Sequence, residues 1–257
     1  MKMKRSEKLG MFTGLVVGVL LLLISVFMIF QTTCKVWGAE KPANATQQGI
    51  DVSSHQGKID WEQVKNSALA DYAIIRCGYG VNQTDKDDKY WDYNSSECER
   101  LGIPYGTYLY SGADTTAKAK SEAEHVVRLL QGKNLTYPIY YDMEADMLNQ
   151  LSSTQIGNIA KTFLNTMESY GYKNVAVYSN KYLFETKLTA SVFSDYPKWI
   201  AQHSNKCTYQ GSYHMWQYST QGVIPGISEK VDLNYKIGNW TYAGYSSAKK
   251  TVVVKPK

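Results

Sequence analysis

The sequence contains few of the residues that build disulfide scaffolds and metal centres. Cysteine occurs only four times in 257 residues and never as C-x-x-C, which excludes a disulfide-dense domain and a thiolate zinc site. The four histidines show no H-E-x-x-H or similar ligand spacing, so we expect neither a metal nor a cofactor. If the chain is exported, one pair among Cys77, Cys98 and Cys207 could form a disulfide.

The sequence also lacks the motifs of nucleotide chemistry and of activated nucleophiles. No phosphate-binding loop occurs, and the G-Y-G of residues 78–80 is not a dinucleotide fingerprint. No motif marks an activated serine or cysteine. These absences weigh against nucleotide-dependent enzymes and against serine and cysteine hydrolases.

The body of the chain lacks a strong charge of either sign, although the formal net charge of the whole is +5. The excess positive charge lies in residues 1–9, 31–48 and 248–257, whereas residues 49–247 contain 18 basic against 21 acidic side chains. A slightly acidic body does not attract a polyphosphate, so we expect no nucleic-acid partner.

One long apolar run is present, at residues 10–30, and it follows the basic segment 1–9. About 20 apolar residues suffice to cross a bilayer as a helix, and the positive-inside rule places residues 1–9 in the cytoplasm. The run is longer than a usual secretory h-region, but the A-N-A of residues 43–45 resembles a cleavage site. Two outcomes stay open: a single-pass protein of the cell membrane with an extracellular body, or a secreted protein.

The body, at residues 49–243, alternates short apolar runs with longer amphipathic ones. A polar linker at 31–48 precedes it and a basic tail at 244–257 follows it. Strands are predicted at 49–53, 72–77, 105–110, 137–142, 174–179, 197–203, 213–218 and 230–234, and helices at 60–68, 88–101, 115–131, 153–170 and 180–188. Five strand–helix units followed by three strands close most simply as an α/β fold, a modified TIM-like barrel of eight strands.

Four acidic side chains fall at the carboxyl ends of predicted strands. Asp51 ends the first strand, Asp142 and Glu144 end the fourth, and Asp232 lies in the last. In α/β barrels these ends meet on one open face, where chemistry collects. Because Asp142 and Glu144 are two residues apart, an extended strand points both to the same side. They either enter the barrel mouth together or cap the following helix, since acids favour helix N-termini.

Aromatic side chains occur at the same strand ends, where flat rings with polar edges can stack on sugars. They are Tyr79, Tyr108, Tyr110, Tyr141, Trp199, Trp216 and Tyr218. Several carboxylates and several rings at one end of a barrel are the arrangement expected of a glycoside hydrolase.

Six sequence blocks resemble, in order, those of glycoside hydrolase family 25, the Chalaropsis-type lysozymes or N-acetylmuramidases. The blocks are GIDVSSHQGKIDWEQVK (49–65), YAIIRCGYG (72–80), LGIPYGTYLYS (101–111), YYDMEAD (140–146), PKWIAQHS (197–204) and MWQYSTQGVIPGISEKVDLNYKIG (215–238). The resemblance implies a (β/α)5(β)3 barrel. It also implies cleavage of the β-1,4 bond between N-acetylmuramic acid and N-acetylglucosamine in peptidoglycan.

The resemblance further implies a role for each acid. Glu144 would be the general acid, which protonates the leaving oxygen and later activates water, and Asp142 would assist it. Asp51 and Asp232 would complete the acidic floor. Either the 2-acetamido group of the sugar, held by Asp142, or a carboxylate would attack the anomeric carbon. The implied substrate-binding residues are Tyr79, Tyr108, Tyr141, Trp199, Trp216, Gln217 and Asn234.

Some positions depart from the family pattern. His203 stands where tyrosine is frequent, and Leu109 and Tyr110 stand where histidine and phenylalanine are common. The four acids are all present, and crowding by Asp142 and Asp232 is expected to raise the pKa of Glu144.

Two other functions compete with cleavage of the glycan. One is a module that binds wall glycan without cutting it. The other is a hydrolase of the stem peptide or of an acetyl group, which usually needs a metal or a cysteine nucleophile. In every case the expected partner is peptidoglycan. The protein is expected to be a monomer that acts in remodelling of the cell wall or in cell lysis.

Overall fold

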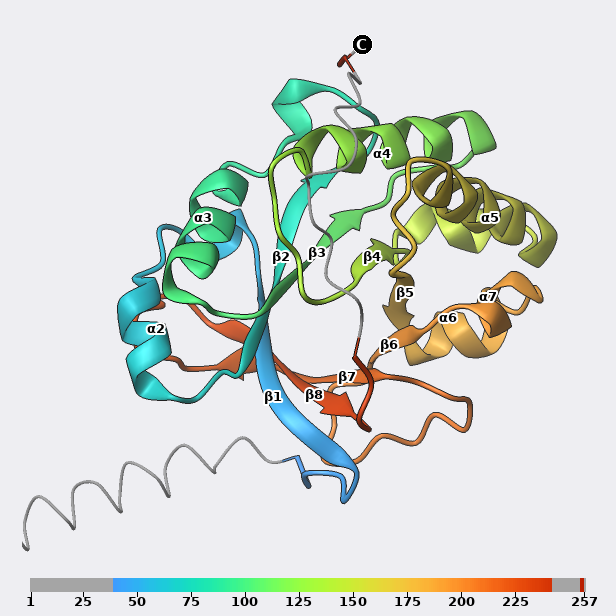
Figure 1. Ribbon diagram of the computed structural model, residues 1–257. Helices are drawn as coiled ribbons and strands as arrows, with labels where there is room; N and C mark the ends of the chain where they lie inside the picture. Colours follow the sequence, from blue (N-terminus) through green and yellow to red (C-terminus); the bar gives the residue numbers. More distant parts are fainter. Residues whose placement is uncertain (1–38, 242–254, 257) are drawn as a thin grey trace, which may run out of the picture. The chain divides into compact units, whose positions relative to one another are not determined.

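The computed structural model of the protein describes residues 39–241 and 255–256, and these residues form a closed barrel of eight strands flanked by helices (Figure 1). The strands are β1 (Ala45–Val52), β2 (Tyr72–Tyr79), β3 (Tyr105–Tyr110), β4 (Ile139–Asp142), β5 (Val175–Asn180), β6 (Lys198–Ala201), β7 (Met215–Gly222) and β8 (Val231–Ile237). Strands β1 to β7 run parallel, and β8 is antiparallel to both β7 and β1. The last strand therefore closes the barrel.

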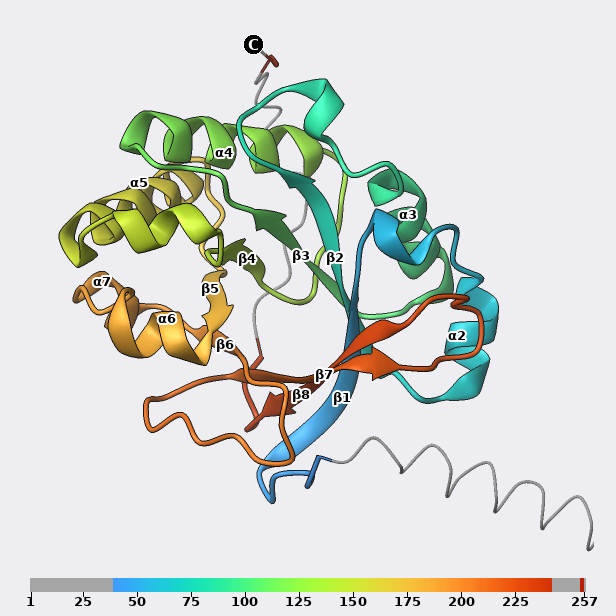
Figure 2. The same cartoon turned by 180° about the vertical axis from the view of Figure 1, so that it is seen from behind.

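Helices connect the first six strands on the outside of the barrel (Figure 2). They are α2 (Trp61–Ser67), α3 (Trp91–Leu101), α4 (Thr116–Leu129), α5 (Ser153–Ser169), α6 (Lys181–Thr186) and α7 (Val192–Asp195), with short 3-10 helices η1 (Ser54–Gln56), η2 (Thr84–Lys86) and η3 (Asp146–Gln150) in the loops. The link between β7 and β8 is a short turn, too short for the crossover that a parallel pair needs, so β8 runs antiparallel.

Local chemistry explains where these helices begin. The side chains of Asp60, Thr115, Ser152 and Asn180 each accept a hydrogen bond from a backbone N–H in the first turn of the helix that follows, as N-cap residues do. Helix α5 buries an apolar stripe with helical spacing, formed by Ile156, Ile159, Ala160, Phe163, Leu164 and Met167. These signals are short-range, which is why the sequence predicts these helices.

Large rings fill the inside of the barrel. Trp199 lies with its ring centroid 4.4 Å from Tyr178 and 4.9 Å from Tyr140, and Tyr72, Ile74 and Met215 belong to the same buried cluster. Gly49 makes room for this packing, because a Cβ there would lie 2.4 Å from the ring of Tyr72. The interior is therefore a packed core and not a channel.

The predicted eight-stranded barrel with five strand–helix units is confirmed. Strand β1 begins at Ala45, within the segment expected as a linker, because β8 supplies a backbone partner as far as Ala45↔Ile237. Helix α7 lies outside the predicted helices, since four residues are too few to show a helical period.

Several expectations concern parts of the chain outside the described residues. The apolar run at 10–30 and most of the tail fall there, so an anchor or signal segment stays a prediction. Across residues 39–241 and 255–256, no helix has the length and apolar character to cross a bilayer. Cys77, Cys98 and Cys207 are free thiols, so the disulfide that the sequence allowed among them is not formed.

Candidate active site

A small pocket of about 60 Å³ opens at the carboxyl ends of the barrel strands. Its lining comes from seven strands and one loop, and consists of Asp51, Tyr108, Asp142, Glu144, Tyr178, Trp199, Gln217 and Asp232. Four of these eight side chains are carboxylic acids. The structure thus brings together all four acids, but Asp232 lies at the amino end of antiparallel β8 and not, as the sequence predicted, at the carboxyl end of a strand.

Asp51 and Asp232 face each other across the antiparallel pair that closes the barrel. Asp51 Oδ2 accepts hydrogen bonds from Asn234 Nδ2 at 2.7 Å and from Gln217 Nε2 at 3.0 Å. Gln217 Nε2 also lies 3.3 Å from Asp232 Oδ2. Burial raises the pKa of both acids, that of Asp232 to about 6, and the charge of Asp232 raises the pKa of Asp51 further. The two carboxyls are therefore harder to ionise together than two exposed aspartates.

The amide of Gln217 joins the acid pair to the opposite wall of the pocket. Its Oε1 accepts from Tyr178 Oη at 2.9 Å and lies 2.9 Å from His203 Nε2. With Oε1 and Nε2 both engaged, the amide has one orientation that satisfies all its partners. Asn234 is fixed in the same way, because Trp199 Nε1 donates to its Oδ1 at 2.8 Å. The floor of the pocket is therefore rigid before any ligand arrives.

Asp142 ends strand β4 and is 3% exposed. Its Oδ1 has no hydrogen-bond partner among the described residues. Burial raises the pKa of this carboxyl well above its usual range, and the charges of Glu144 and Asp51 raise it further, against a lowering effect of Arg76. A buried, unpaired carboxylate oxygen is costly. At the wall of a pocket, such an oxygen is available to accept a hydrogen bond from a ligand.

Glu144 lies two residues beyond Asp142 at the same pocket and is half-buried. Burial raises the pKa of Glu144 and the charge of Asp51 raises it further, whereas the charge of His203 and a hydrogen bond from Tyr178 lower it. The shift has the predicted direction, with burial as its first cause, and Glu144 and its neighbours Asp142 and Asp232 also repel each other, which raises the pKa of those two acids. A carboxyl group with a raised pKa keeps its proton at higher pH, as a general acid requires.

Replacement of His203 with glutamine tests the charge balance at Glu144. Glutamine can still donate to Gln217 Oε1, but the cationic charge that lowers the pKa of Glu144 is lost. The pKa of Glu144 is then expected to rise, so the acid stays protonated to higher pH and the alkaline limb of the pH–rate profile moves to higher pH. His203→Lys, which retains the positive charge, is the matched control. A limb that stays in place or moves to lower pH in His203→Gln would contradict the assignment of Glu144 as the acid.

Most of the predicted ligand-binding residues lie at or beside the pocket. The pocket is lined by Tyr108, Trp199 and Gln217, and Asn234 donates a hydrogen bond to Asp51. Tyr79 and Tyr110 lie farther out, at the exposed ends of β2 and β3, where they line a neighbouring pocket.

Tyr141, Trp216 and Tyr218 do not reach the pocket, and their expected contact with a ligand is wrong. Tyr141 is wholly buried on the outer side of the barrel, where it stacks on Phe163 of α5 at 3.8 Å and its hydroxyl donates to Glu122 Oε2 at 2.6 Å. Trp216 is also wholly buried and its Nε1 donates to the Gln202 carbonyl. Tyr218 stacks on Tyr235 at 4.4 Å.

Strand alternation explains this correction. Asp142 and Gln217 face the interior, so their neighbours Tyr141 and Trp216 must face outward. The same rule could have found Tyr178, which the sequence analysis did not select although it lines the pocket. Arg76 was also missed, because a single arginine within an apolar strand carries no distinguishing pattern.

In the part of the chain that the structure describes, no three or more histidine, cysteine, aspartate or glutamate side chains are placed so that they could hold a metal ion together. The chemistry available to the pocket's own residues is that of carboxyl groups with raised pKa values, amide donors and tyrosine hydroxyls.

Comparison with known proteins supports a carbohydrate-active pocket. Residues 50–227 match the family described as glycosyl hydrolases family 25. The autolytic lysozyme of Clostridium acetobutylicum is 30% identical over 188 residues, which cover 73% of this chain and 55% of that protein. The modular autolysin LytC of Streptococcus pneumoniae is similar in structure, with a TM-score of 0.67 at 33% identity over 74% of this chain and 46% of that one.

The fold is shared more widely than the sequence. A family 25 glycosyl hydrolase of Bacillus anthracis has a TM-score of 0.68 at 21% identity, over 79% of this chain and 94% of that one. This chain spans about half the length of the clostridial and pneumococcal relatives. The family match covers most of the barrel and includes Asp51, Asp142 and Glu144, so the chain belongs to glycosyl hydrolase family 25.

Proposed function

We propose that the chain is a muramidase that hydrolyses the β-1,4 bond between N-acetylmuramic acid and N-acetylglucosamine in peptidoglycan. The observation that carries this proposal is the pocket with four carboxyl groups, in which Glu144 is half-buried with a raised pKa and Asp142 has an unpaired oxygen. Two relatives are named lysozymes. The pneumococcal autolysin has been solved in complex with a synthetic peptidoglycan ligand.

In the proposed reaction, Glu144 donates its proton to the glycosidic oxygen as the bond from that oxygen to the anomeric carbon breaks. The positive charge that develops on the sugar is neutralised either by the oxygen of its own 2-acetamido group or by a carboxylate. Asp142 Oδ1 is suited to accept the acetamido N–H, because it is buried and has no other partner. Glu144, now ionised, then takes a proton from water as the water oxygen attacks the anomeric carbon and the bond from that carbon to the acetamido or carboxylate oxygen breaks.

A binding module that holds wall glycan without cutting it is disfavoured by the same geometry. Such a module has no need for four acids in one small pocket, because burying them without using them costs stability. Asp51, Asp142 and Asp232 all have raised pKa values caused first by burial. This cost is expected where function requires the acids.

Analysis of the products on defined peptidoglycan tests the proposed function. We expect mass spectrometry to find released muropeptides that end in reducing N-acetylmuramic acid. Reducing N-acetylglucosamine ends would mean that the neighbouring bond is cut. Retention of the chain on insoluble wall without new reducing ends would favour the binding module instead.

A further inference from the structure

A second pocket lies beside the acid pocket, at the carboxyl ends of β1, β2 and β3. It encloses about 420 Å³ and is lined by His55, Arg76, Tyr79 and Tyr110. The two pockets are neighbours, because Tyr110 of the second pocket is paired with Asp142 of the first across β3 and β4, and Arg76 is paired with Tyr108 across β2 and β3. The larger pocket is not filled by any residue that the structure describes.

The guanidinium of Arg76 is held in place from behind. Arg76 Nε donates to Asp88 Oδ2 at 2.8 Å, and Nη2 donates to Ser54 Oγ at 2.8 Å. The Asp88 side chain is 0% exposed, against 15% for Arg76. Asp88 Oδ2 also accepts from the Ser54 backbone N–H, and Asp88 Oδ1 from that of Tyr90. Arg76 is thus fixed by a buried carboxylate that is itself fully hydrogen-bonded.

This arrangement leaves donors on the guanidinium for a ligand. An arginine side chain has five N–H donors in a rigid plane, and the two hydrogen bonds to Asp88 and Ser54 engage one edge of it. A planar guanidinium edge matches a carboxylate, which it can bind with two parallel hydrogen bonds. His55 on η1 adds an imidazole to the same pocket.

Two exposed tyrosines form the walls. Tyr79 is 40% exposed and Tyr110 is 36% exposed, and they are direct partners across β2 and β3. The Tyr79 hydroxyl donates to the Asp85 carbonyl at 3.3 Å, and Lys86 Nζ lies 5.3 Å from its ring centroid. The rings offer apolar surface around a cationic floor.

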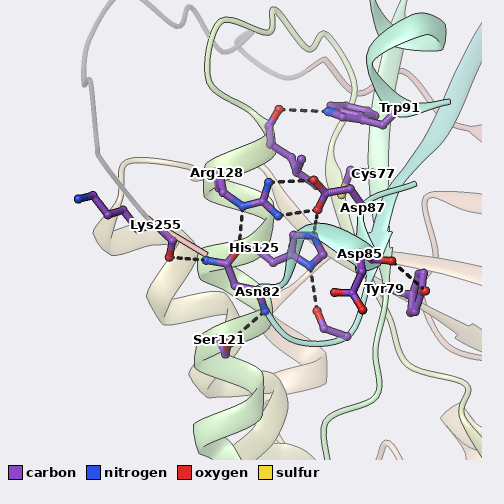
Figure 3. A network of polar contacts seen from close by, with 12 residues as sticks. Cys77, Tyr79, Asn82, Asp85, Asp87, Trp91, Ser121, His125, Arg128 and Lys255 are labelled. Carbon is purple, nitrogen blue, oxygen red and sulfur yellow. Dashed lines mark hydrogen bonds and ion pairs between the residues drawn. The ribbon is translucent and has the colours of Figure 1, made fainter. Parts of the chain in front are cut away.

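The loop behind Tyr79 is held by a partly buried polar network, so this wall is built into the fold (Figure 3). Asp87 Oδ1 lies 2.7 Å from His125 Nε2, and Arg128 Nη1 donates to Asp87 Oδ2 at 2.9 Å. Arg128 Nε donates to Asn82 Oδ1 at 2.8 Å, and Ser121 Oγ accepts from the Asn82 backbone N–H. Residues 80–88 are therefore tied to α4 at several points before any substrate binds.

We infer that this pocket binds a carboxylate carried by the muramic acid unit of the substrate, with Arg76 as the group that recognises it. The inference rests on the proposed function and names the part of the substrate that the protein selects. Two sources share the chemistry: the lactyl carboxylate of peptide-free glycan, and a carboxylate of the stem peptide. A neutral ligand would gain little from a fixed guanidinium with unused donors.

The neighbouring acids explain why a cation is needed at this place. Without a cation, a carboxylate on the substrate would lie beside Asp142 and would be repelled by its ionised form. Arg76 stands between the second pocket and Asp142, and its charge already lowers the pKa of Asp142. Without Arg76, the substrate carboxylate would lose its attraction to the guanidinium and would be repelled by Asp142. Replacement of Arg76 should therefore lower activity on anionic substrates more than on neutral ones.

The test compares substrates that differ only in charge. Uncross-linked glycan strands, either peptide-free or peptide-bearing, are used as such and after conversion of their carboxylates to amides. For the wild-type chain we expect kcat/KM to fall on the order of tenfold on amidation, the size of one charge-assisted contact. In Arg76→Gln, the ratio of kcat/KM for the carboxylate substrate to kcat/KM for its amide should approach one. Arg76→Lys should restore part of the preference for the carboxylate.

Arg100→Gln is the matched control, since it removes a positive charge from a surface ion pair with Glu62 and Glu97. A general structural effect of Arg76→Gln would lower both rates equally and keep the wild-type ratio, and this result would overturn the inference. The inference would also be overturned if amidation left kcat/KM of the wild type unchanged on both glycans. An amidation effect in peptide-free glycan identifies the lactyl group, and one confined to peptide-bearing glycan identifies the stem peptide.

Binding measurements separate this inference from the proposed function. In a Glu144→Gln background, calorimetry with soluble muramic acid-containing fragments and their amides gives the same comparison without cleavage. Preference for the carboxylate with no cleavage by the wild type would support the pocket and contradict the muramidase. Cleavage by the wild type without any preference for the carboxylate would support the muramidase and contradict the role of the second pocket.

Discussion

Glu144→Gln is expected to lower the rate of reducing-end release from purified peptidoglycan by a factor on the order of 10² to 10⁴. Glutamine has nearly the shape of glutamate but has no proton to give to the leaving oxygen. Glu144 is half-buried at the pocket, and burial and Asp51 raise its pKa, so the native side chain is suited to hold that proton. The rate on purified sacculi, measured at saturating and limiting substrate, checks the prediction.

The control for this variant is Asp146→Asn. Asp146 is an exposed acid at the start of η3, two residues beyond Glu144 in the same loop. Its replacement changes the charge of the loop without touching the pocket lining, so activity is expected to stay near that of the wild type. A Glu144→Gln variant that folds and retains more than about a tenth of the activity would refute the role of Glu144, given the size of acid–base contributions.

Asp142→Asn is expected to lower kcat on the order of 10²-fold or more without lowering the melting temperature. The activity should fall because the unpaired Oδ1 belongs to a group that can carry a negative charge, whereas an amide cannot and therefore accepts a hydrogen bond from the substrate less strongly. Stability should not fall, because burial raises the pKa of Asp142 and a neutral amide avoids the cost of burying a charge. Steady-state kinetics and thermal unfolding of the same preparation check both parts.

Asp92→Asn serves as the control for Asp142. Asp92 is 88% exposed and pairs with Lys133 on the surface, so neither quantity should change measurably. If Asp142→Asn unfolds at a clearly lower temperature and keeps its kcat, then Asp142 supports the barrel and does not act on the substrate. If Asp142→Asn loses both stability and activity, kcat is measured for the folded fraction alone. A normal kcat in that fraction would mean that Asp142 takes no part in catalysis.

The barrel was predictable because its signals are local. Each of the first five strands shows as a short apolar run, and cap residues such as Ser152 and Thr115 mark helix starts within a few positions. The beginning of β1 at Ala45 was not predictable in this way. The polar residues Thr46 to Gln48 resemble a linker, and only the distant β8 gives them strand partners.

The site was predictable in part for the same reason. Asp51, Asp142 and Glu144 each follow or end an apolar strand, and the parallel strands β1 and β4 bring these ends together. Asp232 reaches the same pocket from the amino end of β8, which runs antiparallel. The aromatic set was less reliable. Tyr141 and Trp216 lie beside true pocket residues in the chain, and one step along a strand turns a side chain to the other face.

The order of the strands and the positions of the acids along the chain depend on neighbours within a few residues, so both follow from local sequence patterns. The groups that shift the pKa values of those acids come together only when the chain folds. Gln217 lies 166 positions from Asp51 and Asn234 lies 183 positions from it, yet both donate to the same carboxylate oxygen. Closure of the barrel by β8 creates these contacts. The fixing of Arg76 by Asp88 and Ser54 has the same origin, since three separate segments meet at one face only after folding.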